Sequence, residues 1–168
     1  MAFTAQDVKK LREMTNVGMM DCKKALQATD GDMDKAVDWL REKGLAKAAK
    51  KADRVAAEGV AYATVVDGVG VAIEVNSETD FAAKTDAFMD LVKNLAVVVA
   101  QQNPADVEAL KACTYPGTQL TVTEIMQEKV MSIGENMQIR RFARFPENTS
   151  VAYVHAGGTH GVLVNLAV

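Results

Sequence analysis

Few side chains in this sequence have the types and spacing that covalent chemistry requires. The chain contains two cysteines, Cys22 and Cys113, and two histidines, His155 and His160. Neither histidine has a Cys, Asp or Glu near it at the spacing of metal ligands. A cysteine nucleophile would have to reach one of these histidines to gain a general base. We therefore interpret the chain as a non-enzymatic protein that holds neither a metal nor a cofactor.

Two glycine- or acid-rich segments resemble ligand-binding loops but lack their key residues. The acidic run 30–34 imitates the start of a calcium loop, yet Lys35 stands where Gly is needed and Arg41 where the bidentate Glu is needed. The glycines of 68–70 lie in an expected hairpin turn and not between a strand and a helix, which excludes a dinucleotide site. The sequence contains no P-loop.

Basic residues gather in one stretch, with Lys43, Lys47, Lys50, Lys51 and Arg54 close together. They have no aromatic neighbours for base stacking, and the chain carries a net charge of −3 with a pI near 5.4. We interpret the stretch as a solvated helix face and expect no direct contact with nucleic acid.

Two apolar features point instead to contact with another protein. Thr79-Asp80 is a typical helix cap, but Phe81 beside it gains nothing from a helix N-terminus. We expect one long helix to start there, with Phe81 either packed in the core or offered as a wedge to a partner. Met19 and Met20 follow Gly18, and they either fill the core or provide a flexible apolar contact.

The periodicity of apolar residues predicts helices first and strands later. Three helices are expected within residues 4–44, the last ended by Gly44, and a solvated linker helix over 45–58. Strands are expected at 60–66, 69–75, 137–145, 151–155 and 162–168, and helices at 79–102, 104–111 and 123–133.

This pattern predicts an α+β fold in two domains. Residues 1–54 form a three-helix bundle with its linker, and residues 55–168 form a mostly antiparallel sheet with helices packed on one face. Two distant cysteines, no secretory signal and no apolar run of about 18 residues predict a cytoplasmic protein without a membrane span.

Several ordered motifs resemble the bacterial translation elongation factor Ts family. They are Gly18–Leu26, Lys47–Ala52, Glu74–Asn76 with Thr79–Phe81, and Ile133–Asn136 with Arg140-Arg141. The resemblance implies a guanine-nucleotide exchange factor that binds elongation factor Tu and promotes GDP release by disturbing its magnesium and phosphate site, with no covalent chemistry. It also implies that the first three helices form a bundle of the ubiquitin-associated type.

The resemblance further implies which residues contact the GTPase. Asp80 and Phe81 would press near the magnesium site. Those implied to touch the nucleotide domain are Arg12, Met19, Met20 and Lys23, and those implied near the phosphate-binding end are Ile133, Gly134 and His155.

Two expectations concern the rest of the chain. Many members of the family continue beyond the position of Val168, so we expect either a fragment or a short form that self-associates through its apolar C-terminal strand. The alternative function is a non-catalytic helical-bundle binding module on an RNA-associated or structural scaffold. An outward Phe81 separates the two functions, because a scaffold has no need of one.

Overall fold

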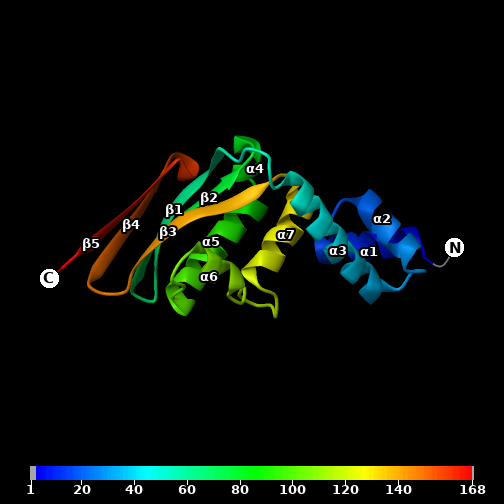
Figure 1. The fold of residues 1–168 in the computed structure, drawn as a ribbon, viewed down its shortest axis with the longest axis horizontal. Coiled ribbons are helices and arrows are strands. Elements are labelled where there is room, and N and C mark those ends of the chain that lie inside the picture. Colours follow the sequence, from blue (N-terminus) through cyan, green and yellow to red (C-terminus); the bar gives the residue numbers. More distant parts are fainter. Residues whose placement is uncertain (1–2, 168) are drawn as a thin grey trace. The chain divides into compact units, whose positions relative to one another are not determined.

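The computed structural model describes residues 3–167, which divide into two compact units (Figure 1). The first unit contains the residues up to Asp53 together with Gln127–Gly134. The second contains Arg54–Met126 and the residues from Glu135 onward. We describe each unit by itself. Within residues 3–167, no helix is long and apolar enough to cross a membrane.

Three helices build most of the first unit: α1 (Ala5–Thr15), α2 (Met19–Ala28) and α3 (Met33–Lys51). Thr4 and Asp7 form a capping box at the start of α1, and Asp32 caps α3. The buried core contains Val8, Leu11, Val17, Cys22, Ala25, Leu26, Ala36 and Leu40, together with Met131 from a later helix. The prediction of three helices in this part of the chain is therefore confirmed.

The predicted end of the third helix at Gly44 is wrong, because α3 continues to Lys51. Gly44 is buried, and a Cβ there would lie 3.5 Å from the carbonyl oxygen of Gln127 and 3.6 Å from Sδ of Met131. These are ordinary van der Waals distances, so Gly44 is a buried residue within α3 and does not end the helix. No separate linker helix follows, since residues 45–51 belong to α3 and the next element begins at Glu58.

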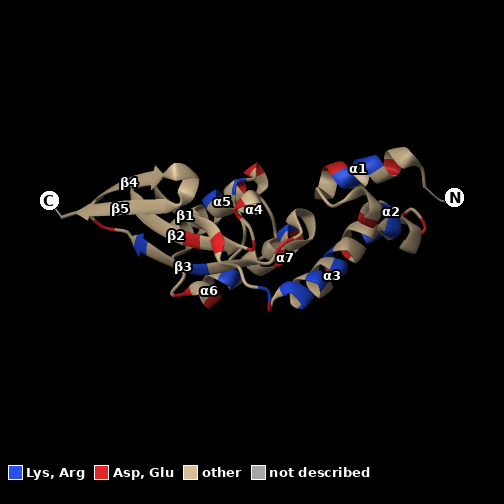
Figure 2. Ribbon diagram, turned by 90° about the horizontal axis from the view of Figure 1, so that it is seen from above, with Lys and Arg blue, Asp and Glu red and all other residues tan. Residues whose placement is uncertain are grey.

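The basic stretch on α3 is solvated, as expected, but its charges have partners. Several basic segments, drawn in blue, lie along α3 (Figure 2), where Lys43 and Lys50 are exposed and Lys47 is half-buried. Lys47 Nζ lies 2.7 Å from a carboxylate oxygen of Asp21. Lys43, predicted to lack an aromatic neighbour, lies 5.3 Å from the centre of the Trp39 ring, because residues four apart share a helix face.

The strands of the second unit are antiparallel and form two sheets. The sequence predicted a single sheet. β1 (Glu58–Val66), β2 (Val69–Ser77) and β3 (Met137–Phe145) pair in the order β1-β2-β3. β4 (Thr149–His155) pairs with β5 (His160–Leu166), and the short helix η1 (Ala156–Gly158) joins them. Asp67 and Gly68 both adopt positive φ, which is the tight hairpin turn that Asp-Gly favours.

The β4–β5 hairpin packs closely on the first sheet. A Cβ on Gly161 would lie 2.7 Å from the carbonyl oxygen of Ala61 in β1, and one on Gly70 would meet the Ser150 side chain. These glycines allow the two sheets to approach. All five predicted strands are present within residues 3–167, although Val168, the last residue of the predicted strand 162–168, lies outside the described residues. The hairpin does not extend the three-stranded sheet.

Four helices complete the fold: α4 (Asp80–Ala83), α5 (Asp86–Gln102), α6 (Val107–Ala112) and α7 (Val122–Ile133). α5 packs across β1, β2 and β3, and buries the apolar stripe from Phe88 to Val99 (Figure 1). The predicted single helix from Thr79 is wrong, because α4 and α5 are separate. α6 starts at Val107, where Asp106 provides the cap, and not at Pro104.

Candidate partner-binding site

α4 is a four-residue helix that exposes its one large side chain. Thr79 caps it, since its hydroxyl accepts a hydrogen bond of 3.2 Å from the N–H of Ala82. Ala82 and Ala83 are buried, whereas 80 % of Phe81 is exposed. The core position considered for Phe81 is therefore wrong, and the outward orientation is confirmed.

A second cap explains why Phe81 and Phe88 face different environments. Thr85 starts a new helix, because its hydroxyl accepts the N–H of Phe88 at 3.3 Å. The same hydroxyl donates to the carbonyl of Ala82 at 2.8 Å, which ties α4 to α5. The seven-residue spacing between the two phenylalanines does not place them on one face, since they belong to two helices.

Asp80 lies beside Phe81 and is held ionised. Its carboxylate accepts a hydrogen bond of 2.6 Å from Nζ of Lys84, and about half of the Asp80 side chain remains exposed. This hydrogen bond from Lys84 lowers the pKa of Asp80 below its usual value. α4 therefore presents an anionic group next to an exposed aromatic ring.

On α2, both methionines point outward. Met19 is 51 % and Met20 64 % exposed, whereas Cys22, Ala25 and Leu26 form the buried face of the same helix. The interpretation of the methionines as core filler is wrong for both, because they occupy the first turn after Gly18. Lys23, one turn beyond Met19, is also exposed, as is Arg12 on α1.

Sequence reasoning missed a third exposed methionine in this unit. Met14 on α1 is 56 % exposed. Met14 and Thr15 both stand at helical spacing from buried Leu11, and Thr15 is the more buried of the two. The periodicity carried the information, because Thr15, four residues after buried Leu11, continues its face.

Ile133 and Gly134 form the end of α7. Gly134 has a φ of +90°, and its N–H donates to the carbonyl of Val130 at 3.0 Å. The carbonyl of Gly134 accepts a hydrogen bond from Nζ of Lys51. Ile133 is half-buried and Gly134 exposed, so the end of the helix is accessible.

His155 ends β4 and is exposed. Its Nδ1 lies 2.9 Å from the hydroxyl of Tyr153, and its ring centre lies 6.0 Å from that of His160. Tyr153 is itself 59 % exposed and was not among the expected contacts. The alternation of β4 could have indicated it, because residues two apart share a strand face.

The nine expected contact residues belong to different units. Asp80, Phe81 and His155 lie in the second unit. The first unit contains Arg12, Met19, Met20, Lys23, Ile133 and Gly134. Each is at least partly exposed.

Residues 3–167 contain no cluster of side chains suited to a metal ion. No three of their His, Cys, Asp or Glu residues are placed to hold a metal ion. Burial raises the pKa of the thiols of both Cys22 and Cys113, which favours their protonated form over the nucleophilic thiolate.

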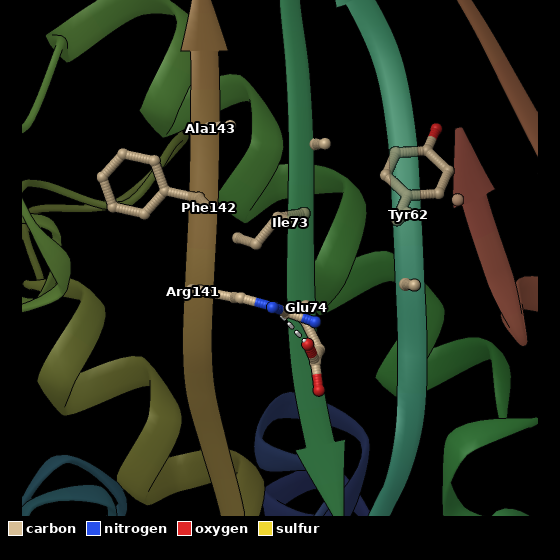
Figure 3. Close-up of a pocket in the computed structure, with 9 residues that line it drawn as sticks. Tyr62, Ile73, Glu74, Arg141, Phe142 and Ala143 are labelled. Atoms are coloured by element: carbon tan, nitrogen blue, oxygen red, sulfur yellow. Dashed lines mark hydrogen bonds and ion pairs between the residues drawn. The ribbon is translucent and has the colours of Figure 1, made fainter. Parts of the chain in front are cut away.

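A pocket of about 210 Å³ lies at the first sheet, but its charged groups already have partners (Figure 3). β1, β2, β3 and Gly161 of β5 line it. Figure 3 shows Arg141 extended toward Glu74, and their atoms approach to 2.7 Å. We therefore base the candidate site on the exposed apolar side chains.

By fold, the chain combines a helical bundle with an α+β unit that presents an aromatic ring on a short helix. The family described as Elongation factor TS matches residues 78–168. The chain belongs to this family.

Curated relatives support the assignment over nearly the whole chain. It is 53 % identical to Elongation factor Ts from Trichlorobacter lovleyi over 98 % of this chain and 54 % of the relative. The protein of the same name from Magnetococcus marinus is 50 % identical, over 99 % of this chain and 55 % of the relative. That from Cereibacter sphaeroides is 54 % identical, over 96 % and 53 %. The chain thus spans about half the length of these relatives.

Proposed function

We propose that this chain promotes guanine-nucleotide exchange on elongation factor Tu during translation elongation, by disturbing the magnesium and phosphate site of that GTPase. The observation that carries the proposal is Phe81, which is 80 % exposed on a capped helix beside the ionised Asp80. Aromatic side chains are enriched at the cores of protein–protein interfaces, so a ring that is 80 % exposed is suited to burial against another protein. The scaffold alternative gives no reason for this exposure.

The mechanism is negative coupling between two ligands of one GTPase. If the factor weakens nucleotide binding by some ratio, the nucleotide weakens factor binding by the same ratio. In P-loop GTPases a Mg²⁺ ion bridges phosphate oxygens, so its displacement weakens the nucleotide. Burial of Phe81 supplies about 1.5–3 kcal/mol to hold the disturbed state. Asp80 brings a negative charge to the same magnesium and phosphate site of the GTPase.

The remaining contacts divide into docking and phosphate-end groups. In this proposal Arg12, Met19, Met20 and Lys23 dock on the nucleotide domain, and the exposure of both methionines supports that role. Ile133, Gly134 and His155 lie near the phosphate-binding end. The three-helix bundle is of the ubiquitin-associated type, no covalent reaction takes place, and the protein works in the cytoplasm.

A second association concerns the β4–β5 hairpin. Its outward face carries five apolar side chains that are between 47 % and 59 % exposed: Val151, Tyr153, Val162, Val164 and Leu166. We propose that two copies associate through this face. Sedimentation should show a dimer at micromolar concentration, and Val164→Lys should shift it to monomer. A wild-type chain that sediments as a monomer over this range contradicts the proposal.

Release of a fluorescent GDP analogue, mant-GDP, from elongation factor Tu tests the main function. The 168-residue chain should accelerate release by at least about tenfold at saturation, which corresponds to about 1.4 kcal/mol of differential binding. An unchanged release rate, with a complex still detectable, would leave only the binding-module function.

The docking role needs substitutions, because deleting the bundle would remove the packing partners of Met131. Met19→Ser with Met20→Ser should raise the concentration of chain needed for half-maximal release and leave the maximal rate unchanged. Met14→Ser is the matched control, because it removes an equally exposed methionine from another helix of the unit. Equal effects of both changes would argue against a specific docking surface.

A further inference from the structure

Glu135 completes the cap of α4 from a distant part of the chain. Its two carboxylate oxygens accept both donors of Thr79: the backbone N–H at 3.0 Å and the hydroxyl at 2.6 Å. The two residues are 56 positions apart. Because the hydroxyl hydrogen points to Glu135, the hydroxyl oxygen can accept the N–H of Ala82 and cap the helix.

A second hydrogen bond joins the same two segments in the opposite direction. A carboxylate oxygen of Glu78 accepts the backbone N–H of Asn136 at 2.6 Å. Thus the carboxylate before Thr79 binds the residue after Glu135, and the carboxylate of Glu135 binds the residue after Glu78. This reciprocal pair lies just beyond Ser77 and Met137, the last backbone pair between β2 and β3. Side chains therefore continue the connection where the two strands diverge.

A local capping box in the same unit shows what Glu135 replaces. At the start of α7, Glu124 accepts both the N–H of Thr121 at 2.7 Å and its hydroxyl at 2.8 Å. There the acid is the third residue of the helix, as in an ordinary capping box. The corresponding residue of α4 is Ala82, which has no carboxylate. The four-residue helix therefore takes its acid from Glu135.

We propose that Glu135 is a positioning residue for nucleotide exchange: it fixes the cap of α4 and so the direction in which Phe81 projects. This inference rests on the proposed function. α4 is too short to be stable through its own hydrogen bonds, so its orientation depends on Thr79 and on the link to α5. A wedge acts only if its ring is held in the correct direction, because small misplacements reduce the rate steeply.

Two substitutions of Glu135 grade the effect. Glu135→Ala removes both acceptors and should reduce the maximal mant-GDP release rate by about tenfold, with a much smaller change in the half-saturating concentration. Glu135→Gln keeps the shape, but its amide offers only one acceptor oxygen to the two donors of Thr79. The maximal release rate of Glu135→Gln should lie between those of wild type and Glu135→Ala.

Glu124→Ala is the matched control. It removes the same two kinds of hydrogen bond from the start of α7, which carries no wedge at that end. It should lower the melting temperature about as much as Glu135→Ala and leave the release rate per folded molecule unchanged. If the two variants reduce release equally, Glu135 acts only through stability and the inference is overturned.

Amide hydrogen exchange on the isolated chain provides a readout that needs no GTPase. In Glu135→Ala, the amides of Thr79 and Ala82 should exchange at least about tenfold faster than in wild type, because their hydrogen-bond acceptors are lost or freed to move. Unchanged protection overturns the inference. Faster exchange of these amides with a normal release rate also overturns it. If these amides exchange faster in Glu135→Ala but the wild-type chain does not accelerate GDP release, the capping role of Glu135 stands and the proposed function has failed.

Discussion

Phe81 and Phe88 lie seven residues apart and have opposite environments. Each follows a Thr-Asp pair near the start of a helix, Thr79-Asp80 for one and Thr85-Asp86 for the other. Phe81 is 80 % exposed, and Phe88 is completely buried. The same local cap thus supports a surface role in α4 and a core role in α5.

The difference arises from what each helix packs against. α5 is long, covers the three-stranded sheet and directs a full apolar stripe inward. α4 has four residues, and the small side chains of Ala82 and Ala83 already occupy its inward side. Local sequence sets where a helix starts, whereas the neighbouring sheet decides which aromatic ring is buried.

Replacement of the buried ring should have the largest effect. Phe88→Ala should reduce the free energy of unfolding by about 3–5 kcal/mol, because it leaves a cavity in a well-packed core. Denaturant unfolding measures this loss. Release of mant-GDP per folded molecule should stay normal. A loss of release beyond that caused by unfolding would mean that Phe88 also contributes to exchange.

Replacement of the exposed ring should show the opposite pattern. Phe81→Ala should leave the melting temperature nearly unchanged, since the ring has little contact to lose, and slow stimulated release by about tenfold. Thermal melts and stopped-flow release on one preparation provide both values. A destabilised protein with normal release would mean that Phe81 is structural.

The two threonine caps sharpen the comparison. Thr79→Ala and Thr85→Ala should each reduce the free energy of unfolding by about 1 kcal/mol. Thr79→Ala should also slow release, and more than Thr85→Ala does, because it removes the cap of the helix that carries Phe81, whereas Thr85→Ala removes from that helix only its link to α5. Equal release rates for the two variants would count against a special role for α4.

The smallest expected effect concerns Asp80 and pH. Hydrogen bonding to Lys84 lowers the pKa of Asp80 in the folded protein below its ordinary value of 3.8. The stabilisation is therefore present above pH 3.8 and is lost as pH falls through the lower, folded value. Asp80→Asn should melt slightly lower than wild type at neutral pH, and the gap should close in acid. If the difference in melting temperature persists in acid, the lower stability of Asp80→Asn comes from packing and not from the charge of Asp80.

Where neighbours along the chain carried the signal, the sequence predicted the fold well. The alternation in 60–66 and 69–75, with Asp67-Gly68 between them, located the first hairpin. Asp32, which caps α3 directly before Met33, is likewise a local signal. The second Thr-Asp pair, Thr85-Asp86, is a local sign in the sequence that α4 and α5 are separate helices.

Features set by distant residues could not be predicted in this way. The sequence predicted a helix end at Gly44, but this residue is buried inside α3 against Gln127 and Met131, which are more than 80 residues away in the sequence. The bond between Glu135 and Thr79 joins positions whose proximity follows only from the pairing of β2 with β3. The solvent exposure of Phe81 could not be predicted from its local sequence either, although its position beside a helix cap could.

The most direct test asks whether Phe81 acts through the magnesium site. Stopped-flow release of mant-GDP from elongation factor Tu should be measured with wild type and Phe81→Ala at saturation, in excess Mg²⁺ and after chelation. In Mg²⁺ the wild type should be about tenfold faster, and without Mg²⁺ the two rates should converge, because the ion that the wedge disturbs is already gone. An equal ratio of rates in both conditions would contradict the account.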